Sequence, residues 1–172
     1  MSGFSSRAVH ALGLMVALCA ARASAAENRA AAGPCPEKGE VVTVVAKKHE
    51  LWLCQDGAAV GRFRVALGRG GLDKRRRGDS RTPLGTYALG LPRPSVQYGV
   101  FIPIDYPTPE QVAQGFTGSE VGIHGPPRGL SEPEYPLSWV DWTRGCIATA
   151  LDAEIERIAE FVRAHQPLLV IR

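Results

Sequence analysis

The stretch DWTRGCIATALDAEIERI, residues Asp141 to Ile158, places one cysteine between a glycine and the beginning of a helical pattern. Apolar residues then recur at spacings that place them on one face of a helix: Leu151, Ile155, Ile158, Ala159 and Val162. Thr149 and Asp152, three residues apart, predict a capping pair at the start of this helix. The sequence therefore predicts one amphipathic C-terminal helix directly after Cys146.

Most of the remaining chain has the pattern of short β-strands. Strands are expected at residues 40–48, 85–90, 99–106, 120–125 and 168–172, with a hairpin at 50–68 that turns at Asp56-Gly57. Thr108, Pro109 and Gln111 have the spacing of a capped first turn and predict a short helix near residue 110. Residues 126–136 are rich in proline and predict a surface loop. The fold class is therefore mainly β, with a docked helix.

The first 25 residues have the organisation of a secretory signal peptide. Arg7 precedes an uncharged run from Ala11 to Ala21, and Ala23-Ser24-Ala25 provides a small-residue cleavage site. The apolar run is too short to span a membrane, so no stable membrane span is expected. We expect a signal peptide at 1–25, a lead-in at 26–40 and one domain at 41–172, exported to the periplasm or cell envelope.

Removal of the signal peptide would leave a nearly neutral chain. The formal net charge of +3 falls to +1, because two arginines and no acidic residue are lost. A nucleic-acid partner is therefore not expected. The basic run DKRRRGD, residues Asp73 to Asp79, is interpreted as a solvated loop, and contact with an anionic polymer of the envelope is the alternative.

Three cysteines follow the signal peptide: Cys35, Cys54 and Cys146. An odd number leaves at least one of them without an intramolecular disulfide. Cys35 and Cys54 flank one predicted strand, so we expect these two to pair and Cys146 to stay free. The cysteines lack the short spacings of zinc sites, and neither a metal nor another cofactor is expected.

Cys146 has the surroundings of a reactive thiol. Gly145 lets the backbone approach closely or adopt a positive φ. A thiolate beside Arg144 and near a helix N-terminus would have a lowered pKa. The alternative is an inert, packed cysteine.

A cysteine nucleophile also needs a base, and His124 is the best candidate. It ends a predicted strand 22 residues before Cys146, and the proline-rich loop between them can return the chain to the same sheet edge. His49 is interpreted as a surface residue and His165 as a helix-end residue. A purely structural histidine is the alternative for His124.

Three separated motifs resemble those of the L,D-transpeptidase catalytic domain, also called the YkuD-like domain. They are IHGPPRG, DWTRGCIA and the segment RVALGRGG…GDSRTPLGTYAL, which contains Thr-Pro-x-Gly-x-Tyr at residues 82–87. The resemblance covers about residues 41–172. It implies a YkuD-type β-sandwich of mixed sheets.

The resemblance also implies the roles of individual residues. Cys146 would be the nucleophile and His124 the general base and acid, with the Gly125 carbonyl orienting the imidazole. Backbone N–H groups of Gly145 and Cys146 could hold the oxyanion, and Thr143 would match the Ser/Thr of the family motif.

Two positions depart from that family pattern. Arg144 stands where many members have a second histidine, and Ala148 stands where many have an arginine. Arg128 and Arg144, together with Thr143, are therefore candidates for substrate binding.

The function implied is that of an exported cysteine acyltransferase acting on the stem peptides of peptidoglycan. Cys146 would attack the carbonyl that links the L-centre of diaminopimelate to D-alanine and form a thioester. A second stem peptide, or an envelope lipoprotein or other protein, would be the acceptor. The alternatives are an L,D-carboxypeptidase or amidase acting on the same linkages, and a non-catalytic peptidoglycan-binding module.

Overall fold

The computed structural model describes residues 33–129 and 137–172. The predicted signal peptide, the beginning of the lead-in and part of the proline-rich loop lie outside these ranges. Within the described ranges, no helix has the length and apolar character needed to cross a membrane.

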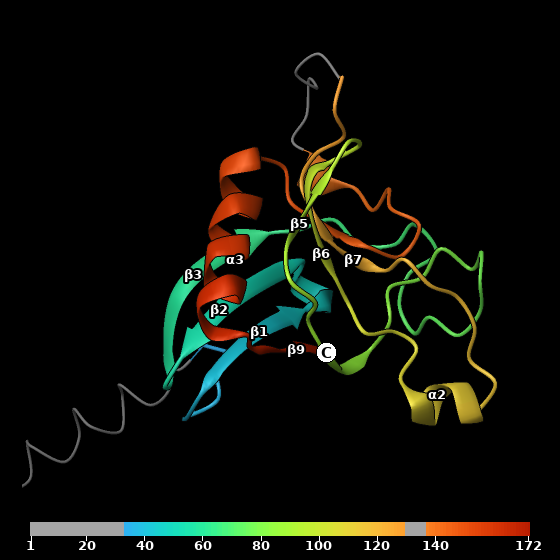
Figure 1. Cartoon of the computed structure of the whole chain (residues 1–172), viewed down its shortest axis with the longest axis horizontal. Helices are drawn as coiled ribbons and strands as arrows, with labels where there is room; N and C mark the ends of the chain where they lie inside the picture. Colours follow the sequence, from blue (N-terminus) through green and yellow to red (C-terminus); the bar gives the residue numbers. More distant parts are fainter. Residues whose placement is uncertain (1–32, 130–136) are drawn as a thin grey trace, which may run out of the picture. The chain divides into compact units, whose positions relative to one another are not determined.

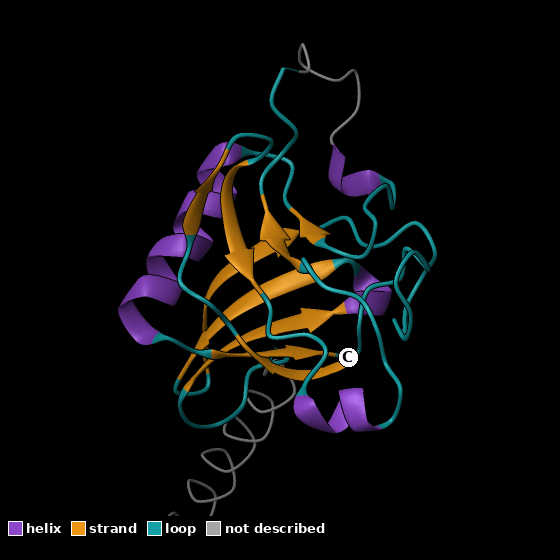
Figure 2. Ribbon diagram, turned by 45° about the vertical axis from the view of Figure 1, so that its right-hand side comes forward, coloured by secondary structure: helices purple, strands orange, loops and turns teal. Residues whose placement is uncertain are grey.

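Two mixed β-sheets form the framework (Figures 1 and 2). The five-stranded sheet has the order β3-β2-β1-β9-β4, and the four-stranded sheet has the order β5-β6-β7-β8. Strands of the first sheet are β1 (Glu40–Val45), β2 (Glu50–Gln55), β3 (Ala58–Arg64), β4 (Gly85–Ala88) and β9 (Leu168–Ile171). Strands of the second are β5 (Arg93–Ser95), β6 (Gly99–Pro103), β7 (Gly122–His124) and β8 (Ile147–Ala148). The pairs β1–β9 and β7–β8 are parallel and the rest antiparallel, so the predicted mainly β fold of mixed sheets is confirmed.

Local turn and capping signals were reliable guides to the elements. The β2–β3 hairpin turns at Asp56 and Gly57, which both have positive φ (46° and 84°), as a type I′ turn requires. Helix α2 (Pro109–Ala113) has the predicted capping box between Thr108 and Gln111. The sequence did not predict β5, which contains Pro94 and lies at the edge of its sheet, where a missing N–H is tolerated.

The start of helix α3 (Asp152–His165) differs from the prediction. Leu151 precedes the helix and is exposed, and the buried face includes Phe161 instead. Thr149 does not cap the helix: Leu151 is the residue before its first turn, and the Thr149 hydroxyl donates to the Leu151 carbonyl at 3.2 Å. The Glu154 carboxylate instead accepts from the N–H groups of Ala150 and Leu151, at 3.1 Å each.

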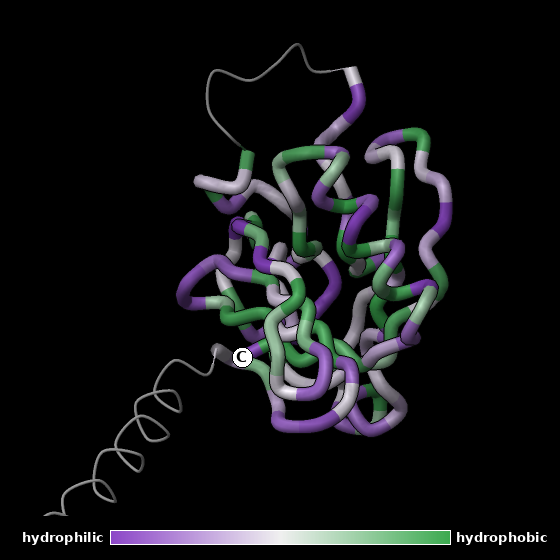
Figure 3. Tube along the Cα trace, turned by 90° about the vertical axis from the view of Figure 1, so that its left-hand side faces the viewer, coloured by the Kyte–Doolittle hydropathy of each residue, from purple (hydrophilic) through white to green (hydrophobic). Residues whose placement is uncertain are grey.

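One hydrophobic core joins both sheets and α3. Its members include Val42 and Leu169 from the first sheet, Ile102 and Ile123 from the second, and Ile158 from α3. Hydrophobic and hydrophilic stretches alternate along the trace, as expected for elements with one buried face (Figure 3). Two short 3-10 helices, η1 (Ala46–Lys48) and η2 (Leu137–Trp139), complete the elements.

The disulfide joins the lead-in to the first sheet. Cys35 is bonded to Cys54 of β2, with their Cα atoms 5.2 Å apart, while Cys146 is free. The predicted pairing is therefore confirmed.

Candidate active site

Cys146 lies in a tight turn directly before β8. Gly145 has a φ of +125°, and a Cβ on it would lie 2.6 Å from the Arg81 carbonyl oxygen. Both features exclude a larger residue at this position. The helix that was expected to follow Cys146, with a capping pair at Thr149 and Asp152, begins only at Asp152.

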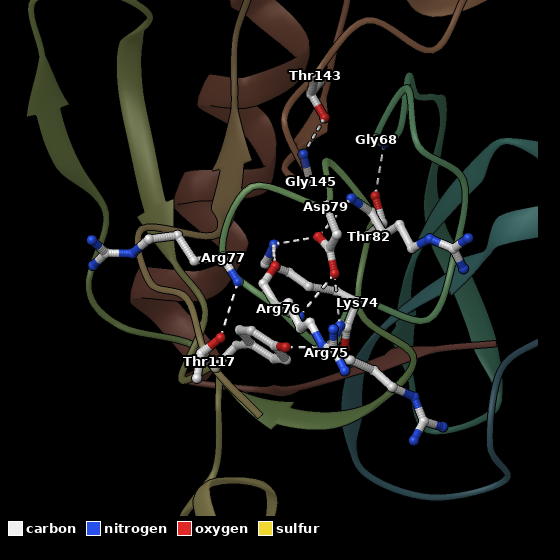
Figure 4. A network of polar contacts seen from close by, with 12 residues as sticks. Gly68, Lys74, Arg75, Arg76, Arg77, Asp79, Thr82, Thr117, Thr143 and Gly145 are labelled. Atoms are coloured by element: carbon white, nitrogen blue, oxygen red, sulfur yellow. Dashed lines mark hydrogen bonds and ion pairs between the residues drawn. The ribbon is translucent and has the colours of Figure 1, made fainter. Parts of the chain in front are cut away.

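Hydrogen bonds of the Thr143 side chain stabilise this turn (Figure 4). Its hydroxyl donates to the Cys146 carbonyl at 2.7 Å and accepts from the Gly145 N–H at 3.1 Å. The residue is buried, and its backbone is hydrogen-bonded to Leu67 and Arg69. Thr143, which was predicted to bind substrate, lines the same cavity as Cys146, and the hydrogen bonds of its side chain are with the turn itself.

His124 is the last residue of β7 and is 1% exposed. Its Nδ1 lies 2.7 Å from the carbonyl oxygen of Gly125. A carbonyl can only accept a hydrogen bond, so Nδ1 carries the proton. In the neutral ring, Nε2 then has a free lone pair and can act as a base.

The strand register brings His124 and Cys146 to the same place. Ile147 pairs with Ile123 and Ala148 with His124, so continuing the register backwards sets Cys146 beside Gly122. Gly122 and His124 are two residues apart and face the same side of the sheet. The imidazole and the thiol consequently line one cavity of about 680 Å³.

Aromatic rings enclose the imidazole. The Tyr98 ring is stacked on it at 3.7 Å, and Trp142 meets it edge-on at 5.7 Å. Phe101 lies farther away, at 6.4 Å between centroids. These aromatic residues were not predicted from the sequence, although a tryptophan three residues before Gly145 could have indicated one of them.

Burial sets the protonation states of the pair. It lowers the pKa of His124 to about 4, against the opposing effect of the Gly125 carbonyl. It also raises the pKa of the Cys146 thiol, although the Gly122 N–H and the Lys74 charge act in the opposite direction. The predicted lowering of the Cys146 pKa by a helix terminus is therefore wrong. Near neutral pH the resting pair is an imidazole and a thiol.

The thiol has a backbone acceptor close by. Cys146 Sγ lies 3.6 Å from the Glu120 carbonyl oxygen, within reach of a weak S–H hydrogen bond. Glu120 has a left-handed φ of 58°, an uncommon conformation for this residue type.

The cavity is predominantly basic. Its lining includes five basic residues in the described part of the chain: Arg69, Lys74, Arg77, Arg93 and Arg144. Glu120 is the acidic residue among the described lining, and Arg93 lies 3.4 Å from it. Such a lining favours anionic groups on a bound molecule.

Other predicted residues have different surroundings. Arg128 is not among the described lining residues, and its guanidinium pairs with Asp152 at 2.6 Å. His49 is only partly exposed and contacts the Asp141 carboxylate at 3.1 Å, so its reading as a plain surface residue was incomplete. His165 lies at the end of α3 as predicted, 4.7 Å from the Phe161 ring.

The run DKRRRGD is more than a solvated loop. Arg75, Arg76 and Arg77 are exposed, but Lys74 is buried on the cavity wall.

The described residues include no group of three His, Cys, Asp or Glu side chains that could hold a metal ion.

Comparison with known families and structures is consistent with this geometry. Residues 39–170 match the family described as YkuD, the L,D-transpeptidase catalytic domain. A search of curated protein sequences finds no match.

Several solved structures share the fold. The helical cell shape determining protein Pgp2 from Campylobacter jejuni has a TM-score of 0.64 and 24% identity, covering 83% of this chain and 53% of that one. Bd1075 from Bdellovibrio bacteriovorus has a TM-score of 0.58 and 21% identity, covering 78% and 48%. An L,D-transpeptidase from Stackebrandtia nassauensis has a TM-score of 0.54 and 14% identity, covering 86% and 63%. The chain thus spans about half the length of the first two.

Proposed function

Because this chain belongs to the YkuD family of L,D-transpeptidase catalytic domains, we propose that it is a cysteine acyltransferase acting on the stem peptides of peptidoglycan. The observation that carries the proposal is the buried His124, whose Nδ1 is bonded to the Gly125 carbonyl, in one cavity with the free thiol of Cys146. Such a chain would work outside the cytoplasmic membrane, where the stems are accessible.

Acylation uses the two reactive side chains in sequence. Nε2 of His124 takes the thiol proton, and the sulfur of Cys146 attacks the carbonyl between the L-centre of diaminopimelate and D-alanine. The carbonyl oxygen becomes an oxyanion. When the tetrahedral intermediate collapses, the C–N bond breaks, and the proton held by His124 passes to the departing amine. The products are D-alanine and a thioester on Cys146.

Backbone N–H groups near Cys146 are the proposed oxyanion donors. The Gly145 N–H already donates to Thr143, so the Cys146 N–H is the stronger candidate. A donor of this kind typically contributes about 10²–10³ in rate, because it is aimed at charge that develops only in the transition state.

Exposed arginines would hold the substrate's charges. A stem peptide carries free carboxylates, and Arg144 and Arg93 line the same cavity as the thiol. Arginine suits this task because its planar fork can bind a carboxylate through two hydrogen bonds. Arg128 is a weaker candidate than expected, since it already has Asp152 as a partner.

The second half-reaction decides the class of enzyme. If an amine of another stem or of an envelope protein attacks the thioester, the chain is a transpeptidase. If water attacks, the chain is an L,D-carboxypeptidase or amidase. A non-catalytic peptidoglycan-binding module is disfavoured, because binding alone does not require a paired histidine and free cysteine.

Mass spectrometry of purified muropeptides incubated with the protein tests the proposal. Cross-linked dimers would establish transpeptidation, and stems shortened by one D-alanine would establish hydrolysis. Cys146→Ala is the matched control and should give neither product. Unchanged muropeptides with wild-type protein that is folded and has an alkylatable thiol would contradict the proposal.

A further inference from the structure

Lys74 is a buried lysine on the cavity wall, and the mechanism described above gives it no role. Its side chain is 4% exposed, whereas the three arginines that follow it are exposed. Burying an ammonium group costs free energy unless its charge is paired. Its position therefore needs an explanation.

Asp79 holds this ammonium group in place. Nζ of Lys74 donates to Asp79 Oδ1 at 2.7 Å and to the Arg76 carbonyl at 3.1 Å. The carboxylate also accepts from the N–H groups of Arg75, Arg76 and Arg81. Figure 4 shows Asp79 among Lys74, Arg75 and Arg76. Although burial alone would raise it, the hydrogen bonds hold the pKa of Asp79 well below its usual range.

The backbone of the loop is fixed as well. The Tyr106 hydroxyl donates to the Lys74 carbonyl at 3.0 Å. The Thr117 N–H donates to the Arg75 carbonyl at 2.9 Å, and its hydroxyl accepts from the Arg77 N–H at 3.1 Å. These contacts to two other segments restrict where the lysine can lie.

The Lys74 side chain runs next to the turn that carries the thiol. A Cβ on Gly145 would lie 3.7 Å from Lys74 Cδ, and one on Gly118 would lie 3.1 Å from Lys74 Cε. Lys74 and Gly118 line the cavity together with Cys146. An ammonium group has three N–H donors. Two of these donors have partners within the described ranges, the Arg76 carbonyl and the Asp79 carboxylate.

The other ionisable groups around the thiol are less effective than Lys74. Arg144 and Glu120 are exposed, so solvent and salt screen their charges. Burial keeps His124 and Tyr98 neutral near pH 7, because it lowers the pKa of the first and raises that of the second. The exposed rim adds Arg69, Arg77 and Arg93. Lys74 is the buried cation among these described residues.

We propose that Lys74 is a positioning residue whose clamped ammonium group stabilises the Cys146 thiolate while His124 takes the proton. The inference rests on the proposed function, because it treats Cys146 as the nucleophile. Negative charge must develop on sulfur in a place where burial disfavours it. A fixed cation shielded from solvent offsets this cost more effectively than an exposed one.

The test is the rate of Cys146 alkylation by iodoacetamide as a function of pH, because this measures the thiolate without any substrate. Lys74→Met should displace the profile to higher pH and lower the rate at pH 7.5 about fivefold. Lys74→Arg retains the charge and should restore most of the profile. Lys47→Met changes an exposed lysine outside the cavity and should leave the profile unchanged.

A second variant guards against a folding defect. Lys74→Met leaves the Asp79 carboxylate without its cation, whereas Lys74→Met/Asp79→Asn removes both charges. If the folded double variant alkylates with the wild-type profile, the proposal is wrong. If turnover falls but the profile does not move, Lys74 has a structural role only, and the proposal is again wrong. If wild-type protein lacks turnover while Lys74→Met still displaces the profile, the proposed function fails and the effect of Lys74 on the thiol stands.

Discussion

A buried histidine and a partly buried cysteine, with opposite pKa shifts, line the same cavity. The pKa of His124 is lowered to about 4 and that of Cys146 is raised, in both cases mainly by burial. Near neutral pH the histidine is a free base and the cysteine is a thiol. Proton transfer must therefore accompany or precede attack, so neither residue can act without the other.

Removing either member of the pair should abolish turnover. We expect Cys146→Ala and His124→Ala to lose nearly all activity, because a nucleophile and its base act as a unit. Cys146→Ser should also be nearly inactive, since an alcohol is much harder to ionise in the same site. Muropeptide turnover gives the activity, and thermal melting of each variant confirms that the fold is retained. A near-wild-type rate for His124→Ala would exclude the mechanism.

The His124 shift also predicts how stability depends on pH. Its pKa falls from 6.5 to about 4 on folding. The unfolded chain therefore binds more protons than the folded one as pH drops through this window. The free energy of unfolding should be highest above pH 6.5 and should decrease toward pH 4, by at most about 3 kcal/mol.

Urea denaturation between pH 7 and pH 4 measures this dependence. His124→Gln cannot titrate and should flatten it in that window. The lowered pKa of the Asp79 carboxyl adds a separate loss of stability only at lower pH, below its ordinary value of 3.8. Equal stability of the wild-type protein at pH 7 and pH 4 would show that the histidine is not buried in its neutral form.

The sequence predicted Cys146 and His124 as a pair, and both line one cavity, but the sequence did not predict what surrounds them. Cys146 and His124 stand out because of their residue types and flanking glycines. The direction of the Cys146 pKa shift depends on burial, which no local pattern encodes, and the predicted direction was wrong. The burial of Lys74 was missed for the same reason, since a lysine within a basic run is usually solvated.

At the scale of elements, predictions succeeded where the signal is local. The Asp56-Gly57 turn and the Thr108–Gln111 capping box each lie within four residues, and both are as predicted. The start of α3 was misplaced because Thr149 is held beside β7: its N–H donates to the His124 carbonyl, 25 residues away in the chain, at 2.9 Å. Its hydroxyl donates to the Leu151 carbonyl and does not cap the helix.

The turn between Thr143 and Cys146 is the element on which the site depends most directly. Thr143→Val keeps the shape of the side chain but removes both hydrogen bonds to the turn. Leaving these buried groups without a partner costs about 1–3 kcal/mol, and a displaced sulfur lowers the rate about 10²-fold. Thr143→Ser keeps the hydroxyl and should stay close to wild type. Turnover measurements compare the three proteins, and equal rates for Val and Thr would contradict this role.

At the scale of the whole molecule, the site is assembled from distant segments. The loop at 74–79, the segment before β7 and the turn before β8 all contribute to one cavity wall. The parallel pairing of β1 with β9 likewise joins the two ends of the domain. Most elements other than β5 and β8 could be predicted from pattern. These pairings could not, because they depend on side-chain fit across long sequence separations. The family resemblance supplied the fold that local reasoning could not assemble.

The disulfide between Cys35 and Cys54 is a covalent cross-link within the domain. It should stabilise the folded domain without affecting the reaction at Cys146. Cys35 and Cys54 are 19 residues apart in the sequence. Closing a loop of this size restricts the unfolded chain and is typically worth about 3 kcal/mol. Cys35→Ala/Cys54→Ala should therefore lower the melting temperature but leave turnover per folded molecule and the alkylation profile of Cys146 nearly unchanged.

Thiol counting on native protein that begins at Ala26 checks the pairing directly. One reactive thiol is expected, and it should disappear in Cys146→Ala. Three reactive thiols would mean that the bridge is absent from the protein in solution. A count of one that survives Cys146→Ala would place the free thiol at Cys35 or Cys54, and the nucleophile would then have been misassigned. The measurement thus tests the covalent framework and the reactive residue independently.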